Sequence, residues 1–298
     1  MSEQKPSGSG PRPFSVVVPT LDRPAALRRC LEGFTRLEYP SWELIVVNDG
    51  GASSFSSIDA DLRDRLPLTL VDAEHRGPAA ARNTGARAAG MPYLAFTDDD
   101  CVPRPDWLLQ LDRGFTEIGA SVLGGGCLNP YPANVPAATW QLYLDFLREY
   151  FTDASGNHLM LPSNNVAYER EAYWAVDGFD ESYPLAAAED FDLSYRIVER
   201  GYRQRYFEPA LVWHHHRNTA TGYLRQQFRY GKGTFDLRRR RYSINDLAGG
   251  RGGFYPNLMR FLRRRRAPWG VWFLILLTPI AHRCGVEARR FQAARARS

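Results

Sequence analysis

Short apolar runs alternate with amphipathic segments over residues 14–97, and this alternation constrains the fold more than any other feature. The runs, at residues 14–18, 43–47, 68–71 and 93–97, are mostly apolar and rich in β-branched residues, as is typical of buried strands. Apolar residues at helical spacing indicate helices around residues 22–34, 58–66 and 78–89. Strands that alternate with helices in this way predict an α/β fold, with one mostly parallel sheet flanked by helices.

A polar segment follows each of these runs. Residues 19–23, 48–50, 75–77 and 98–100 would lie at the carboxyl edge of a parallel sheet, where open α/β sheets bind ligands. Because alternate side chains share a face, Asp98 and Asp100 can converge while Asp99 points away. Converging carboxylates suit Mg²⁺ or Mn²⁺ held together with a phosphorylated substrate, and a solvated acidic turn is the alternative. The phosphate-binding patterns GxGxxG and GxxxxGK[ST] do not occur in the sequence.

The same patterns continue to residue 216. Helices are expected at residues 105–118 and 139–151 and from Glu189 to about residue 201, and strands at 122–127, 161–167 and 206–213. The apolar side of the 139–151 helix is expected to pack in the core; it carries Trp140, Tyr143, Leu144 and Leu147. Glu189 and Asp190 open their helix, where acidic side chains also stabilise the helix dipole. Three histidines, residues 214–216, follow the last strand and form either a metal site or a solvated loop.

Charge is distributed unevenly along the chain. Residues 1–216 carry 19 Lys and Arg against 30 Asp and Glu, whereas residues 217–266 carry 14 against 2 and residues 267–298 carry 5 against 1. A basic C-terminal third on an acidic body implies an anionic partner or surface. Nucleic acid is not expected as that partner, because no DNA- or RNA-binding module accompanies the arginines.

The C-terminal third contains one markedly apolar run, residues 267–281. These fifteen residues, interrupted by Pro268 and Pro279, fall short of the ~20 residues that a perpendicular membrane span requires. A helix in the membrane interface, with arginines on lipid phosphates, is therefore expected, and the protein would be peripheral on the cytoplasmic face. The alternative is a helix packed on the preceding α/β domain or on a homodimer partner. The four cysteines show no zinc spacing, which favours a reducing cytoplasm.

Three regions follow from these patterns. Residues 1–13 are polar, rich in Gly, Ser and Pro, and expected to be disordered, with no signal peptide. Residues 14–216 would form the α/β domain and residues 217–298 a basic helical extension.

Four motif blocks in order give the chain a family resemblance. They are VVVPTLDR at 16–23, ELIVVNDGG at 43–51, HRGPAAARNTG at 75–85 with AFTDDDCVPRPDWL at 95–108, and GFDES with AAAEDFDLSYRIVERGYR over 178–203, followed by VWHHH at 212–216. With these blocks, the chain resembles family 2 inverting glycosyltransferases of the GT-A fold, whose sheet is Rossmann-like, over about residues 14–216.

The resemblance implies a nucleotide-sugar donor, with UDP preferred, and a hydroxylated acceptor that could be lipid-linked. In that family Pro19, Thr20 and Asp49 would line the base pocket, and His75 stands where relatives usually have Asn. Arg82 would pair with the diphosphate or with the carboxylate cluster, and a surface arginine is the alternative.

The resemblance also implies a metal site and a catalytic base. Asp98 would lie near the ribose and the metal, and Asp100 would bind Mg²⁺ or Mn²⁺ directly. His214 would complete the metal shell, with His216 as second choice. Asp190 would act as the general base that takes the proton of the acceptor hydroxyl, and Glu189 is the alternative.

Other functions remain open at this stage. Residues 226–230 (QQFRY) resemble the QxxRW segment of processive polysaccharide synthases, with Tyr in place of Trp, and would form an acceptor or donor lid. A sugar-nucleotide pyrophosphorylase would need a glycine- and lysine-rich loop near the N-terminus, which this sequence lacks. A non-catalytic sugar-nucleotide-binding module is a further alternative, which the carboxylates at 98, 100 and 190 argue against.

Overall fold

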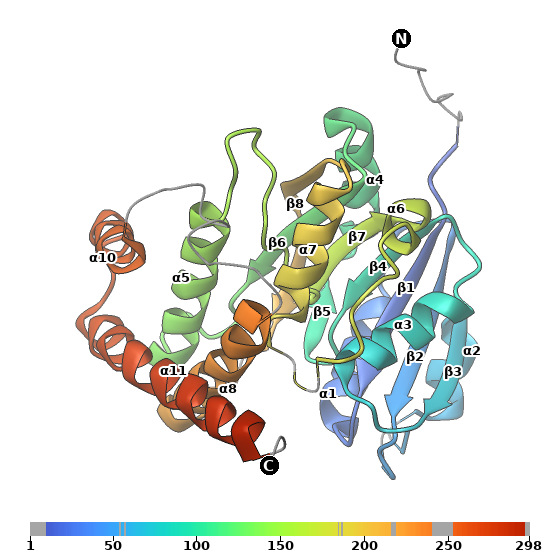
Figure 1. The fold of residues 1–298 in the computed structure, drawn as a ribbon. Coiled ribbons are helices and arrows are strands. Elements are labelled where there is room, and N and C mark those ends of the chain that lie inside the picture. Colours follow the sequence, from blue (N-terminus) through green and yellow to red (C-terminus); the bar gives the residue numbers. More distant parts are fainter. Residues whose placement is uncertain are drawn as a thin grey trace.

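The sheet at the centre of this computed structural model carries helices on both faces, and a group of longer helices lies beside it (Figure 1). The structure describes residues 10–53, 55–56, 58–183, 185, 187–215, 219–239 and 253–295. Residues 1–9 of the expected N-terminal tail and His216 lie outside the described residues.

The described strands form one eight-stranded sheet in the order β3-β2-β1-β4-β7-β6-β8-β5. The strands are β1 (Phe14–Thr20), β2 (Trp42–Asp49), β3 (Leu68–Ala73), β4 (Tyr93–Thr97), β5 (Cys101–Pro103), β6 (Val122–Leu128), β7 (Asn165–Glu169) and β8 (Gln204–His214). Four strand pairings are parallel, and the pairings β4–β7, β6–β7 and β5–β8 are antiparallel. The prediction of a mostly parallel α/β sheet is therefore confirmed.

Helices follow most of the strands, as the sequence predicts. They are α1 (Pro24–Phe34), α2 (Ala60–Arg65), α3 (Pro78–Ala88), α4 (Trp107–Ile118), α5 (Val135–Tyr150), α6 (Arg170–Trp174), α7 (Glu189–Glu199), α8 (Ala220–Arg239), α10 (Phe254–Arg264) and α11 (Trp269–Arg295). Helix α5 begins four residues before its predicted start, because Asn134 caps it by accepting from the backbone N–H of Ala137.

Two elements depart from the predicted boundaries. The strand expected at 161–167 begins only at Asn165, because a turn closed by a hydrogen bond from the Asn165 N–H to the Pro162 carbonyl precedes it. The short strand β5 was not predicted, and it exists by pairing with the end of β8, Cys101 opposite His214.

The direction of β7 brings three segments together at one edge of the sheet. Because β7 runs antiparallel to β4, its first residue, Asn165, lies opposite Thr97. The Thr97 hydroxyl donates to the Asn164 carbonyl at 2.8 Å. Since β8 ends beside β5, residues 98–101, 163–165 and 214 all meet there.

Small residues let helix α3 lie close against the sheet. Its Ala79, Ala81 and Ala86 are fully buried, and a Cβ at Gly85 would meet a methyl group of Val17 at 2.3 Å. This close packing fixes the position of Arg82 in the middle of α3, at the edge where the aspartates follow β4.

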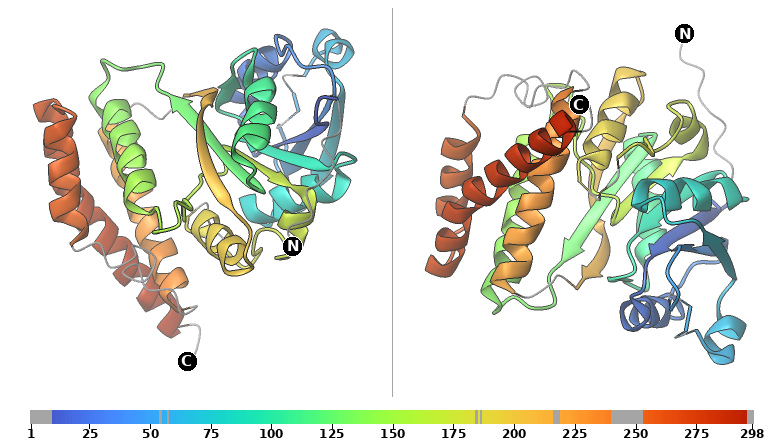
Figure 2. Two further views of the ribbon diagram at one scale, coloured as in Figure 1. Left: turned by 90° about the horizontal axis from the view of Figure 1, so that it is seen from above. Right: turned by 60° about the horizontal axis from the view of Figure 1, so that its bottom comes forward.

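Helices α5, α8, α10 and α11 gather on one side of the sheet (Figure 2). Their side chains form an apolar cluster that includes Phe146, Leu258, Phe261 and Ile275. Helices α8 and α11 cross closely, since a Cβ at Gly285 would meet the Phe228 carbonyl oxygen at 1.9 Å. The basic extension is thus packed on α5, which belongs to the preceding domain.

Of the helices that the structure describes, only α11 is long and apolar enough by composition to cross a membrane. It has 27 residues and continues through Pro279 to Arg295, so the helix is longer than the fifteen-residue apolar run on which the prediction was based. The share of its most apolar window that is buried inside the molecule is 28%. One face of α11 packs against the protein. The residues on its other face therefore determine whether the helix contacts water, lipid or another protein.

Candidate active site

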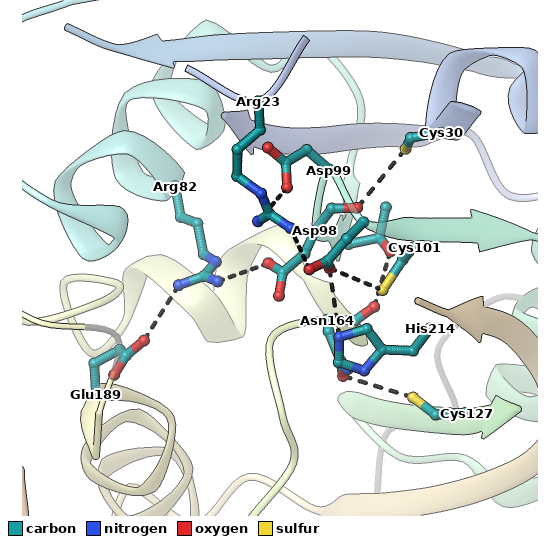
Figure 3. A network of polar contacts seen from close by, with 12 residues as sticks. Arg23, Cys30, Arg82, Asp98, Asp99, Cys101, Cys127, Asn164, Glu189 and His214 are labelled. Atoms are coloured by element: carbon teal, nitrogen blue, oxygen red, sulfur yellow. Dashed lines mark hydrogen bonds and ion pairs between the residues drawn. The ribbon is translucent and has the colours of Figure 1, made fainter. Parts of the chain in front are cut away.

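The first two of the three aspartates that follow β4, Asp98 and Asp99, point in different directions (Figure 3). Asp98 pairs with Arg82 at 2.8 Å, whereas Asp99 pairs with Arg23 at 2.6 Å. Asp98 and Asp100 line a cavity, and Asp99 is not part of that lining. The side chains thus alternate in direction along the turn, with the first and third carboxylates on the cavity side.

Asp99 has a role in the fold and does not line the cavity. It is almost fully buried, pairs with Arg23, and accepts a hydrogen bond from the Thr20 hydroxyl at 2.8 Å. Burial raises the pKa of Asp99 to about 7, although the Arg23 charge opposes the shift. Asp99 therefore joins the end of β1 to the turn after β4.

Arg82 links the aspartate turn to helix α7. Its side chain is 3% exposed, and it pairs with Asp98 at 2.8 Å and with Glu189 at 3.3 Å. Burial lowers the pKa of the guanidinium, but the charges of Asp98, Asp190 and Glu189 outweigh this and raise it. The alternative of a surface arginine is therefore wrong: Arg82 is a buried cation among three carboxylates.

Glu189 and Asp190 open α7 and face the same cavity. Burial, reinforced by the charge of Asp190, raises the pKa of Glu189 to about 8. Burial also raises the pKa of Asp190, although Arg82 and hydrogen bonds from Ser163 oppose this. The Oδ1 atom of Asp190 has no hydrogen-bond partner among the described residues. Asp190 thus has a buried carboxylate oxygen without a partner among the described residues, and its proton affinity is increased.

Asp100 and His214 form an ion pair beside the aspartate turn. Nε2 of His214 lies 3.4 Å from Oδ1 of Asp100, and Asp100 also pairs with Arg23. Burial raises the pKa of Asp100, but His214 and Arg23 outweigh it and hold it below its usual range. Burial lowers the pKa of His214, yet Asp100 raises it overall. Nδ1 of His214 lies 2.9 Å from Nδ2 of Asn164, which orients the imidazole.

The ligand atoms of Asp100, Cys101 and His214 lie within 4.8 Å of one another. A carboxylate and an imidazole suit Mn²⁺ or Mg²⁺, whereas a thiol is a soft ligand. Burial raises the pKa of Cys101, so the thiol stays protonated. The donor set thus fits a hard cation on Asp100 and His214, without Cys101.

The residues expected to bind the nucleotide base do not line the cavity: they are Pro19, Thr20, Asp49 and His75. The Asp49 carboxylate accepts from the backbone N–H groups of Arg76 and Gly77, at 3.0 and 3.1 Å, and lies 3.0 Å from Nδ1 of His75. It therefore holds the start of α3. The six other predicted site residues, apart from the undescribed His216, line one cavity, whereas these four do not.

The cavity has a volume of about 920 Å³. The predicted residues on its wall are Arg82, Asp98, Asp100, Glu189, Asp190 and His214. Gln226, Arg229 and Tyr230 of α8 also line it, which places the QQFRY segment at the site. Trp140, Tyr143, Leu144 and Leu147 of α5, expected in the core, line the same space while packing on the C-terminal helices.

Sequence reasoning gave no role to Arg23, which pairs with Asp99 and Asp100. The sequence did contain a signal for this role. Three consecutive carboxylates after a buried strand require a nearby cation. Arg23 follows β1, and β1 is the strand next to β4 in the sheet. Burial lowers the pKa of Arg23, but these aspartates outweigh it and raise it.

Comparison with known proteins decides the family. The sequence profile of glycosyl transferase family 2 matches residues 15–176. The chain belongs to this family. Over 231 residues, this family 2 chain is 31% identical to the pre-mycofactocin glycosyltransferase of Mycobacterium tuberculosis, covering 76% of this chain and 47% of that protein. The chain thus spans about half the length of this relative.

Solved structures support the same fold for this family 2 chain. A mannosyltransferase of Pyrobaculum calidifontis, in complex with GDP-Man and Mn²⁺, is similar with a TM-score of 0.63 and 20% identity, over 96% of this chain and 76% of that one. Residues 1–349 of TarS of S. aureus, in complex with UDP-GlcNAc, give 0.57 and 17%, over 93% and 89%. The family resemblance and the expected GT-A fold are both confirmed.

Proposed function

We propose that the chain is a metal-dependent inverting glycosyltransferase that moves a sugar from a nucleotide donor, UDP-linked by preference, to an acceptor hydroxyl. One observation carries this proposal: a carboxylate–imidazole pair and a carboxylate with a free oxygen and raised pKa line one cavity. Membership in family 2 supports it.

Asp190 is the proposed general base. Its Oδ1 is free to accept a proton, and its raised pKa favours taking one. The acceptor oxygen attacks the anomeric carbon as its proton passes to Asp190. The bond from that carbon to the diphosphate oxygen breaks on the opposite side, and the electron pair leaves with the nucleoside diphosphate. Glu189 is less suited to this role, because Arg82 already pairs with it.

Asp100 and His214 are the proposed ligands of Mg²⁺ or Mn²⁺, with Asp98 nearby on the same wall. When bound, the cation would neutralise the charge that develops on the departing diphosphate. Arg23 pairs with Asp100, so it must share or release this carboxylate when a cation binds. The Mn²⁺ in the similar mannosyltransferase structure from Pyrobaculum calidifontis supports the proposal.

Pro19, Thr20, Asp49 and His75 are the proposed contacts of the nucleotide base. An aspartate can accept from the imide N–H of uracil, and UDP-GlcNAc in the similar TarS structure supports a UDP donor. Since Asp49 already accepts two backbone hydrogen bonds, base binding would use its remaining acceptor capacity. Arg82 would then balance the charge of the diphosphate beside Asp98.

Donor release tests this function. Thermal shifts with UDP, GDP, CDP and dTDP, each with and without Mn²⁺, identify the base, and hydrolysis of the matching sugar nucleotides then measures turnover. We expect Mn²⁺-dependent stabilisation by UDP and slow release of UDP from a UDP-sugar. Binding of UDP without hydrolysis or transfer would instead indicate a non-catalytic sugar-nucleotide-binding module.

We also propose that the protein is peripheral on the cytoplasmic face of a membrane. One face of α11 exposes four large apolar residues: Trp269 is 89% exposed, and Phe273, Leu276 and Ile280 are 65%, 62% and 61% exposed. Spacings of three and four residues place them on one side of the helix. The four arginines at residues 263–266 are all exposed directly before this stripe. Apolar residues beside cations match an anionic lipid surface.

The cytoplasmic side is proposed on separate grounds. The four cysteines are free thiols, which is consistent with a reducing compartment.

A further inference from the structure

The cavity that holds the carboxylates continues into a chamber walled by aromatic and aliphatic side chains. We propose that this chamber binds the body of an apolar or aromatic acceptor, whose hydroxyl is thereby presented to Asp190. The inference rests on the proposed transfer to a hydroxyl, and it specifies the chemical class of molecule that carries this hydroxyl.

Three helices supply aromatic and aliphatic side chains to the cavity wall. Helix α5 contributes Trp140, Tyr143 and Leu144, α8 contributes Tyr230, and α10 contributes Phe254. The rings of Trp140 and Tyr230 stack with centroids 5.5 Å apart and planes 20° apart. Flat, apolar walls of this kind favour ring-shaped or chain-shaped apolar ligands.

The space is too large to be a packing defect. Protein interiors are close-packed, and few of their voids exceed the size of a water molecule. A cavity of about 920 Å³ lies instead within the range of small-molecule sites. Because Asp100 and Asp190 line the same cavity, a ligand in the chamber is continuous with the proposed reaction centre.

Tyr230 lines the cavity together with Asp190 and Trp140. Burial raises the pKa of its phenol, and the negative charges of Asp190 and Asp98 add to this. The same ring stacks on Trp140. An acceptor packed against Tyr230 therefore lies in the cavity that Asp190 also lines.

Two pairs of polar groups in the cavity lining are already bonded within the protein. The Tyr223 hydroxyl lies 2.7 Å from the Thr278 hydroxyl, and the Thr234 hydroxyl lies 3.0 Å from Nε2 of His282. Beside these groups and the rings of α5 and α8, a polyol would lose hydrogen bonds to water, which is costly, whereas an apolar body gains from the same transfer.

Binding of a simple probe tests the proposal on the full chain. The probe is 4-butylphenol, with myo-inositol as the polyhydroxylated counterpart, titrated calorimetrically with UDP and Mn²⁺ present to occupy the donor side. Leu144→Trp places a larger ring in the chamber. The matched control is Leu142→Trp, because Leu142 is also half-buried on α5 and is not part of the cavity lining.

We expect 4-butylphenol to bind the wild type and Leu142→Trp, and to bind Leu144→Trp about tenfold more weakly or worse, because the added ring occupies its space. Equal binding to both variants, or tighter binding of myo-inositol than of 4-butylphenol, would overturn the proposal. Hydrolysis of a UDP-sugar, measured in parallel, separates the two claims. Probe binding without any hydrolysis would contradict the proposed transferase activity but not the proposed binding of an apolar acceptor in the chamber. Hydrolysis without probe binding would contradict only the proposal for the chamber.

Discussion

Nε2 of His214 lies 3.4 Å from Oδ1 of Asp100, at the point where the end of β8 pairs with β5. The two side chains are partly buried, with 12% of His214 and 15% of Asp100 exposed, and Asn164 orients the imidazole from its other side. A carboxylate and an imidazole held in this way are prepared to bind one hard cation together.

Removal of either partner should therefore abolish metal-dependent turnover. We expect Asp100→Asn and His214→Ala to lower Mn²⁺-dependent release of UDP from a UDP-sugar by about 100-fold or more, because the charge on the leaving group is no longer neutralised. EDTA should do the same to the wild type. Asp106→Asn is the matched control, since Asp106 does not line the cavity. Full turnover in EDTA would contradict the metal assignment.

Substitution of the proposed base should reduce sugar transfer without preventing the binding of UDP. Asp190→Asn keeps the shape of the side chain but cannot take a proton, so transfer should fall by about 10²–10⁴-fold while UDP still binds. Calorimetry with UDP and Mn²⁺ measures binding, and product formation from a UDP-sugar measures transfer. Glu189→Gln should retain more transfer than Asp190→Asn, because Glu189 pairs with Arg82. Wild-type transfer by Asp190→Asn would remove the base assignment.

The raised pKa of Glu189 predicts how stability depends on pH. Burial raises this pKa from 4.5 to about 8, so between these values the folded protein keeps a proton that the unfolded chain has lost. The free energy of unfolding should therefore fall as pH rises through this window. Glu189→Gln removes this contribution, and urea titrations at about pH 5 and about pH 8 should show a smaller fall than in the wild type.

Glu181 supplies the contrast for this measurement. Burial raises its pKa, but Asn83 and Arg87 outweigh this and lower it, so Glu181 is ionised in both states across the same window. Glu181→Gln should leave the pH dependence between pH 5 and pH 8 as in the wild type. If Glu189→Gln behaves in the same way as Glu181→Gln, Glu189 is not the group that titrates.

The sequence predicts the first half of the sheet well because its strands are buried on both faces. The segments at 14–18 and 43–47 have a composition that few other elements share, and they appear as β1 and β2. The three-residue β5 and the late start of β7 depend on pairing with strands far away in the chain. Such pairing leaves no local pattern, so the sequence does not reveal it.

The residues of the site can be predicted only in part from the sequence, for a similar reason. Motifs indicate Asp98, Asp100 and Asp190 and one cation, Arg82, but they assign no role to the second cation, Arg23, which pairs with Asp99 and Asp100. Helix α5 presents the same apolar periodicity whether it fills a core or lines a cavity. Leu144 and its neighbours could therefore be assigned to an apolar face, but not to a chamber.

The crossing of α8 and α11 should be intolerant of any added side chain. A Cβ at Gly231 would meet the His282 carbonyl oxygen at 2.0 Å, and one at Gly285 would meet that of Phe228 at 1.9 Å. Both neighbours are backbone atoms, so the helices must move apart. Gly285→Ala should lower the free energy of unfolding by about 1–3 kcal/mol in denaturant titrations. Gly10→Ala is the control, since a Cβ there meets nothing within 4 Å; equal stability of the two variants would contradict this account.

The exposed stripe on α11 should determine membrane binding. Phe273→Glu combined with Ile280→Glu places two charges where we propose that lipid lies, and each apolar side chain transferred from water contributes about 1.5–3 kcal/mol. We expect the wild type to float with vesicles of phosphatidylcholine and phosphatidylglycerol at low salt, less at high salt because the arginine contribution is screened, and the double variant to remain in the soluble fraction.

Leu109→Glu is the matched control for this experiment, because Leu109 is an exposed apolar residue on α4, far along the chain from α11. It should float like the wild type, since a charge there does not meet the lipid. If the wild type fails to float, or the double variant floats equally well, α11 does not face a membrane. Light scattering then tests whether a second copy of the chain covers the stripe. A dimeric wild type and a monomeric double variant would show that it does. In that outcome the four arginines before Trp269 would lie at the rim of a protein interface, and salt would change the rate of association more than its strength.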